Sequence, residues 1–240
     1  MKWLGEQIRQ RRLVDLRLTK PRKHGLSFLA DARADGETVV IGGYAVESSQ
    51  LLETKKAPWY CIQLDRENCS WAFAKQGQAY RCIAALELLA TLVCLMVFCS
   101  RNETATETEI AMSAFTDNLG NEGLVVKNLT SKFPLYIILL ELTEQLKHKN
   151  VHLDLIWIPR EKNEAADDLT NFKFDRFNLE NRVEVDLLTL PWIILPKLLP
   201  EAVELMREIQ EKKERRNTGN STAVREKKRK SEALRVTDPW

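Results

Sequence analysis

One apolar stretch, Cys82 to Cys99, limits what this chain can fold into more than any other feature. Among its eighteen residues the only charged side chain is Glu87. A helix that is apolar on every side either crosses a membrane or is buried on all sides within a domain. A carboxylate near the centre of a membrane span costs about 2.5–3.5 kcal/mol, and eighteen residues is the lower limit of length. We therefore predict a buried helix over Gln76–Ser100 in a soluble α/β domain with no membrane partner.

Charge is distributed unevenly along the 240 residues. Apolar residues make up 44% and charged residues 29% of the chain, which is typical of a globular protein with one sizeable core. Residues 1–25 contain eight Lys and Arg against two acids, and residues 201–240 contain eleven Lys and Arg against eight acids. The remaining residues, 26–200, contain 17 Lys and Arg against 24 acids. An acidic core with basic ends is expected if the core holds cations and the ends contact a polyanion; solvated tails would have the same composition.

These differences predict four parts of the chain. Residues 1–25 form a basic connector, 26–175 the folded domain, 176–200 an extended Pro-containing arm, and 201–240 a helix followed by a basic, partly disordered tail. The tail clusters KKERR and REKKRK fit a nuclear address, a phosphate-binding segment or a disordered end. Five cysteines without a CxxC pair favour a reducing, intracellular compartment, and the tail slightly favours the nucleus over the cytoplasm.

Two predicted strands near the N-terminus bring in the first acid of interest. Leu26–Ala34 alternates in the manner of a strand, Asp35-Gly36 is a strong hairpin turn signal, and Val39–Val46 is the returning strand. Asp31 lies in the middle of the first strand, where its carboxylate loses hydration unless a partner or a metal compensates. Two shorter strand candidates follow, Trp59–Leu64 and Ser70–Ala74.

The second half of the chain alternates strands with helices. Ile110–Asp117 is predicted as a strand that ends in an acid, and the C-terminal ends of strands are where α/β sheets bind ligands. Helical spacing follows over Asn118–Lys132 and Leu135–Lys149. Val151–Ile158 then alternates as a strand and stops at a proline.

A helix is predicted to begin shortly after that last strand. Asn163 suits its N-cap, and the following EAADDL places acids in the first turn, where the helix dipole favours them. Asp167 lies one turn after Asn163. Its neighbour Asp168 points about 100 degrees away, and we expect it on the solvated side.

Four carboxylates thus fall at strand, helix, strand-end and helix-start positions: Asp31, Glu87, Asp117 and Asp167. We predict that they are catalytic residues and metal ligands, because oxygen ligands suit two Mg²⁺ ions, with Mn²⁺ as a substitute. Two such ions, about 4 Å apart, activate the attacking water and stabilise the leaving oxygen of a phosphodiester. No Ser/His/Asp or Cys/His arrangement competes, because the only histidines are His24, His148 and His152.

The acids and their surroundings resemble the type 1 ribonuclease H domain, particularly the form fused behind the reverse transcriptases of retroelements (retrotransposons). The matching segments, within residues 26–172, are LADARADG at Asp31, AALELLA at Glu87, FTDN at Asp117 and WIPREKNEAAD at Asp167. The resemblance implies an α/β fold with a five-stranded mixed sheet flanked by helices. It also implies Mg²⁺ dependence, endonucleolytic cleavage of the RNA strand of RNA–DNA hybrids, and a polymerase domain upstream of residues 1–25.

The loop before the last acid departs from the family pattern. The family often has a histidine there that assists the water or product release, and this chain has Pro159-Arg160-Glu161-Lys162. We expect Arg160 and Lys162 to contact phosphate, and Asn118 and Asn163 to help bind substrate. Two other functions stay open: a scaffold with this fold that does not cleave, and a related two-metal DNA nuclease or transposase. The full set of acids argues against the scaffold, and the Trp-x-Pro and Asn-Glu-x-x-Asp block argues against the DNA enzyme.

Overall fold

A long hairpin is central to the computed structural model, which describes residues 22–47, 53–74, 77–99 and 110–219. β1 (Arg22–Asp35) and β2 (Thr38–Glu47) pair antiparallel, and the predicted turn is confirmed, with Gly36 at a φ of +59°, a conformation that glycine adopts without steric cost. β1 begins four residues before the predicted start: its first residues, RKHG, show no apolar alternation, yet Arg22 and Lys23 pair with a parallel strand. The rest of the predicted basic connector lies outside the described residues.

Three further strands complete the sheet. β4 (Ile110–Thr116) and β5 (Val151–Trp157) add parallel strands beside β1, and β3 (Trp59–Leu64) pairs antiparallel with β2 on the other side. The strand order is β3-β2-β1-β4-β5. The predicted five-stranded mixed sheet flanked by helices is thereby confirmed.

The second short strand candidate was wrong. Ser70–Phe73 forms a 3₁₀ turn, and Trp71, Ala72 and Phe73 are all buried. Three consecutive buried side chains do not fit a half-buried strand, whose residues face alternate sides. The apolar run in this segment therefore reflects packing of a turn and not a place in the sheet.

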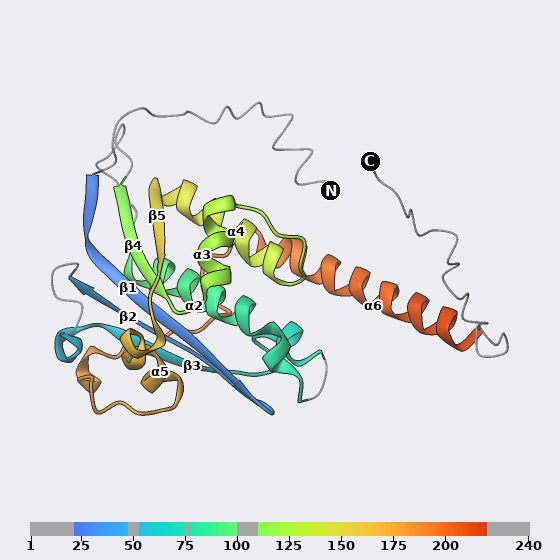
Figure 1. Cartoon of the computed structure of the whole chain (residues 1–240), viewed down its shortest axis with the longest axis horizontal. Coiled ribbons are helices and arrows are strands. Elements are labelled where there is room, and N and C mark those ends of the chain that lie inside the picture. The colour runs from blue at the N-terminus through green and yellow to red at the C-terminus, as the bar shows by residue number, and fades with distance from the viewer. Residues whose placement is uncertain (1–21, 48–52, 75–76, 100–109, 220–240) are drawn as a thin grey trace, which may run out of the picture. The chain divides into compact units, whose positions relative to one another are not determined.

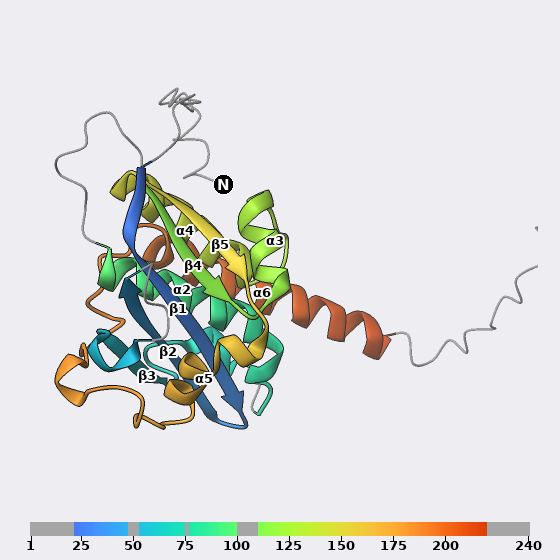
Figure 2. The same ribbon diagram turned by 60° about the vertical axis from the view of Figure 1, so that its left-hand side comes forward.

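Helices cover both faces of the sheet (Figure 1). α2 (Ile83–Phe98) lies against β1 and β2 on one face, and it contacts α3 (Leu119–Lys127) and α4 (Leu135–Lys149) on the same side. α5 (Glu164–Thr170) packs on β1 and β2 from the opposite face, and Figure 2 shows this separation in a second view. The hairpin is therefore enclosed between α2 and α5.

α2 is the buried helix that the sequence predicts. Ten of its sixteen residues are buried, and a 3₁₀ turn, Ala79–Cys82, precedes it, so the α-helix is shorter than the predicted Gln76–Ser100. Ala79–Phe98 is also the one helix of the described part whose length and composition would allow it to cross a membrane, a test that core helices pass as well. Here it is packed between the sheet and α4.

Two adjacent glycines of β2 let helices approach the sheet from both sides. Neighbouring residues of a strand face opposite sides of the sheet. A Cβ atom on Gly43 would overlap Cys94 Sγ of α2, and one on Gly42 would lie 3.0 Å from Leu169 Cβ of α5. Gly42 is also the register partner of Asp31 in β1. Both helices thus come into close contact with the hairpin beside Asp31.

The chain after α5 returns along the outer edge of the sheet. Backbone N–H of Val183 donates to Trp59 O (2.7 Å), and the Trp59 indole N–H donates to Asn178 O (2.8 Å), on either side of the 3₁₀ turn Leu179–Asn181. This part of the predicted arm therefore pairs with Trp59 at the start of β3, on the edge strand of the sheet.

A buried carboxylate of α4 holds the end of that arm. Glu141 is fully buried, and it accepts hydrogen bonds from the backbone N–H groups of residues 193–195 (2.6–3.2 Å) and from Gln145 Nε2 (2.8 Å). α6 (Leu195–Gly219) begins at this point. The chain divides into two compact units after Leu199, and the described part of the second, up to residue 219, is helical.

Candidate metal centre

Asp31 lies where β1 extends beyond its parallel neighbour. β1 pairs with β4 only as far as Leu29↔Phe115, so the next residues of β1 have a strand partner on the β2 side alone. Asp117 follows directly after the last residue of β4. Because β1 and β4 are parallel, the two carboxylates lie at the same end of the sheet, the end at which α/β sheets bind ligands.

Glu87 enters this site from α2 and is oriented by two amides. Its Oε2 accepts hydrogen bonds from Asn118 Nδ2 (2.5 Å) and Asn121 Nδ2 (3.4 Å). The other end of the Asn118 amide, Oδ1, accepts from Asn121 N (3.2 Å) and caps α3. Asn118, which we expected to bind substrate, therefore fixes the position of a carboxylate and the start of a helix.

Three of the four predicted acids converge. One carboxylate oxygen each from Asp31, Glu87 and Asp117 lies within 4.8 Å of the other two, and no other group of this kind occurs among the described residues. They line an open pocket of about 290 Å³ together with Arg160 and Asp167. The donor set consists of carboxylate oxygens alone, which fits a hard divalent cation such as Mg²⁺ or Mn²⁺ and lacks the imidazole and thiolate groups of typical zinc sites.

Asp167 lines the same pocket but is held by other partners. Its Oδ1 accepts a hydrogen bond from Arg160 Nη2 (2.8 Å), and its Oδ2 accepts one from Asn171 Nδ2 (3.0 Å). Asn171 Oδ1 in turn accepts from Arg33 Nη1 (3.0 Å). Asp167 is therefore outside the group of three, although its charge is near enough to raise the pKa of Asp31.

Burial and mutual repulsion raise the pKa of two of these acids. Burial raises the pKa of Asp31 to about 7, and the negative charges of Asp117, Glu87 and Asp167 add to this effect. Burial also raises the pKa of Glu87 to about 7; the Asn118 hydrogen bond opposes the rise and the charge of Asp117 adds to it. Acids perturbed in this way are typical of functional sites. Protons and a divalent cation therefore compete for the cluster.

Asn163 and Trp157 hold Asp117 from the other side. Asn163 is fully buried, and its Nδ2 donates to Ala30 O (3.3 Å) and Asp117 Oδ1 (3.5 Å). It occupies the N-cap position of α5 without a side-chain capping bond, because its ψ of 8° departs from the extended backbone of a capping residue. Trp157 Nε1 donates to Asp117 O (3.1 Å). Asn163 was expected to contact substrate, but its burial gives it a positioning role.

The loop before α5 carries the two predicted phosphate contacts. Arg160 and Lys162 begin and end a 3₁₀ turn and are both exposed, with 75% of the Arg160 side chain accessible. Asp168 belongs neither to the acidic cluster nor to the lining of its pocket, as expected, and it is partly exposed. Its side chain is only 20% exposed, because it forms an ion pair with Arg176 (2.8 Å).

Three site residues were missed from the sequence: Arg33, Asn121 and Asn171. Helical spacing could have indicated two of them, since Asn171 lies four residues after Asp167 and Asn121 three residues after Asn118. Arg33 lies two residues after Asp31, which places both on one face of β1. Its pairing with Asn171 depends on how α5 sits on the sheet, which the sequence does not specify.

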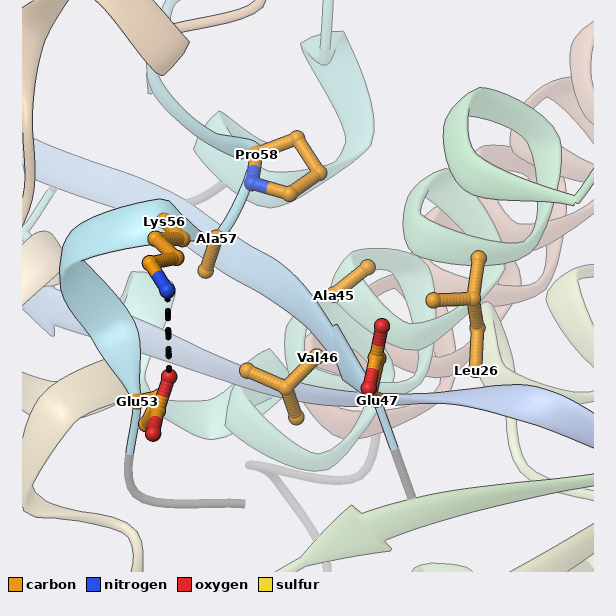
Figure 3. A pocket seen from close by; sticks show the side chains of 8 residues that line it. All are labelled: Leu26, Ala45, Val46, Glu47, Glu53, Lys56, Ala57 and Pro58. Carbon is orange, nitrogen blue, oxygen red and sulfur yellow. Dashed lines mark ion pairs between the residues drawn. The ribbon is translucent and has the colours of Figure 1, made fainter. Parts of the chain in front are cut away.

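A second pocket, of about 230 Å³, lies beside Leu26, nearer the start of β1 than the acidic cluster is (Figure 3). Its lining is mainly apolar, and its charged groups include Lys56 and Glu53, which pair across 3.9 Å. Glu47 and Glu53 are the only acids in the lining, and neither belongs to a metal-binding group within the described residues. The acidic pocket is therefore the candidate site.

Comparison with known proteins identifies similar solved structures. No protein-family model matches the sequence, and no curated protein matches it. A crystal structure of LC11-RNase H1 in complex with RNA/DNA hybrid is 17% identical, covering 63% of this chain and 97% of that chain at a TM-score of 0.41. A crystal structure of RNase H1 from Halobacterium salinarum is 16% identical; the match covers 62% of this chain and 97% of that chain, with a TM-score of 0.38. The N-terminal RNase H domain of a Mycobacterium tuberculosis protein is 16% identical; the match covers 64% of this chain and 94% of that chain, with a TM-score of 0.40.

Proposed function

We propose that this protein is a metal-dependent endonuclease that hydrolyses the RNA strand of RNA–DNA hybrids. The observation that carries the proposal is the convergence of the Asp31, Glu87 and Asp117 carboxylates in one pocket, with Asp167 in its wall. These acids come from the segments in which the sequence resembles ribonuclease H. An oxygen-only cluster suits two-cation phosphodiester chemistry.

The four acids would hold Mg²⁺, or Mn²⁺ in its place. Bound ions would supply an activated water and stabilise the leaving oxygen of the phosphodiester. The chain's own residues keep the ligands in place: Asn118 orients Glu87, and Asn163 and Trp157 hold Asp117. Such outer partners commonly contribute about 10–100-fold to metal affinity or activity.

Substrate contact is proposed for the exposed 3₁₀ turn beside the pocket. Arg160 lines the pocket of the acids and Lys162 ends the same turn, so both would be available to a nucleic-acid backbone that passes there. The same proposal includes the retroelement origin, a polymerase domain upstream of residues 1–25 and an intracellular, preferentially nuclear location. The resemblance of the four acidic segments to the retroelement form supports the first two parts, and the basic tail supports the location.

The test is cleavage of a labelled RNA–DNA hybrid, with double-stranded DNA and single-stranded RNA in parallel, in Mg²⁺, in Mn²⁺ and in chelator. We expect metal-dependent cleavage of the RNA in the hybrid alone. Asp117→Asn should lower the rate by at least about 100-fold, because it removes a ligand and not merely an outer partner. Asp168→Asn is the matched control, since Asp168 is a helical acid outside the cluster.

Each other outcome points to a defined alternative. Hybrid that binds but is not cut would favour the scaffold. Metal-dependent cutting of double-stranded DNA would favour the transposase-like nuclease. Equal loss of activity in the Asp117 and Asp168 variants would separate the activity from the acidic cluster and overturn the site.

A further inference from the structure

The acidic pocket divides into two parts that differ in charge compensation. Among the described residues, no Lys or Arg forms an ion pair with Asp31, Glu87 or Asp117, whereas Asp167 pairs with Arg160 at 2.8 Å. Both oxygens of Asp167 are engaged, one by Arg160 and the other by Asn171. A cation entering the pocket therefore meets three carboxylates without an ion pair on one side and an ion-paired carboxylate on the other.

The Arg160 guanidinium can leave Asp167 without disturbing the core. Its side chain is 75% exposed, and it lies on a three-residue 3₁₀ turn with no buried residues. Asp167 keeps its second partner, Asn171, which Arg33 holds in place. An exposed ion pair of this kind contributes little to stability. The pair is therefore easily exchanged for another cation on Asp167 and another anion on Arg160.

We propose that Arg160 sets the order in which divalent cations enter the site, by occupying Asp167 until a nucleic-acid phosphate withdraws it. This inference rests on the proposed function. The first ion binds the group of Asp31, Glu87 and Asp117, where no side-chain cation has to be displaced. The second ion needs Asp167. It binds weakly while the guanidinium remains there, because it must displace the Arg160 charge and lie close to the charge of the first ion.

A phosphodiester is the anion suited to draw Arg160 away. The planar guanidinium donates two parallel hydrogen bonds to phosphate oxygens, and such charge-assisted bonds are among the strongest that side chains form. Arg160 borders the same pocket as the four acids, so a phosphate bound there lies within reach of the turn. Substrate binding would then free Asp167 for the second ion, and the pair of cations would be complete only when the substrate is present.

The direct test counts cations without nucleic acid. Mn²⁺ is titrated into the full chain, and bound ions are measured from the electron paramagnetic resonance signal of free Mn²⁺ and from calorimetry. For the unaltered chain we expect one ion to bind well and the second weakly. Arg160→Ala should bind the second ion about two- to fivefold more tightly, since exposed ion pairs have effects of up to about 1 kcal/mol. Arg160→Lys, which keeps the charge, should fall between the two.

Two controls make the result decisive. Lys162→Ala removes a positive charge from the same turn without an ion pair to Asp167, and it should change the affinity for the second ion by less than about twofold. The double variant Arg160→Ala/Asp167→Asn should not show the gain in affinity for the second ion. Equal affinities in the Arg160 and Lys162 variants, or a gain that survives Asp167→Asn, would refute the role of Arg160. Because no nucleic acid is present, this result is independent of whether hybrid is cleaved.

Discussion

Asp31→Asn is expected to stabilise the metal-free fold while abolishing cleavage. Burial and neighbouring acids raise the pKa of Asp31 from 3.8 to about 7. A pKa difference of one unit corresponds to about 1.4 kcal/mol, so ionised Asp31 lowers the free energy of unfolding by about 4 kcal/mol at pH 8. The amide that replaces it is also buried and loses hydration, so we expect a net gain of about 2–4 kcal/mol.

The gain should depend on pH in a defined direction. Between pH 4 and pH 7 the folded protein keeps a proton on Asp31 that the unfolded chain has lost, so stability falls as pH rises through this window and is constant above it. The amide does not titrate. The difference between the variant and the unaltered chain should therefore be less than half as large at pH 5 as at pH 8.

Urea unfolding in chelator at pH 5 and pH 8 measures this difference. Asp35→Asn is the matched control, because Asp35 lies at the end of the same strand with its side chain 74% exposed, and we expect a change below about 1 kcal/mol. Added Mg²⁺ should stabilise the unaltered chain more than the Asp31 variant, since only the former has the complete ligand set. Two results would refute the electrostatic account of the site. In one, Asp31→Asn is no more stable than the unaltered chain at pH 8; in the other, the difference in free energy of unfolding is the same at both pH values.

Two further substitutions test the supports of the site. Gly43→Ala should cost about 1–3 kcal/mol, because its Cβ would overlap Cys94 Sγ; Gly123→Ala, with open space around it, should be neutral or stabilising, and thermal unfolding distinguishes the two. Equal changes in stability for the two variants would mean that α2 does not pack closely against β2 at Gly43. Asn118→Ser keeps an acceptor for the α3 cap but loses the hydrogen bond to Glu87, so cleavage should fall about 10–100-fold with little change in stability. Unchanged cleavage at limiting Mg²⁺ would contradict this role.

Much of the fold was predictable because its strongest signals are local. The apolar run around Glu87 could be satisfied only by burial on all sides, and α2 is buried against the sheet. Asp35-Gly36 predicted the hairpin turn, and the alternation of β5 marked its inward residues. The errors occur where the local signal is short or mixed: Ser70–Phe73 is apolar but too compact for a strand, and the first residues of β1 are polar although they pair with β4.

The candidate site was only partly predictable for a different reason. The positions of the four acids follow from the elements that carry them, and the structure brings all four into one pocket. Their partners depend on side-chain geometry across elements far apart in sequence. The hydrogen-bonded residues Arg33 and Asn171 are 138 positions apart in sequence, and Asn163 and Ala30 are 133 positions apart. No spacing within one segment encodes these contacts, so the sequence predicted Asn118 and Asn163 for the site but not their hydrogen bonds to Glu87 and Asp117.

Glu141 decides where this domain can be shortened. By sequence the ribonuclease H-like part ends near residue 175, and a chain cut there would keep all four acids. It would also remove the N–H groups of residues 193–195 that donate to Glu141 and leave this carboxylate, within an otherwise apolar helix face, with Gln145 as its remaining described partner. An unpaired buried charge costs several kcal/mol, a large share of the stability of a domain of this size. We therefore expect the smallest independently folding unit to extend to the first turn of α6.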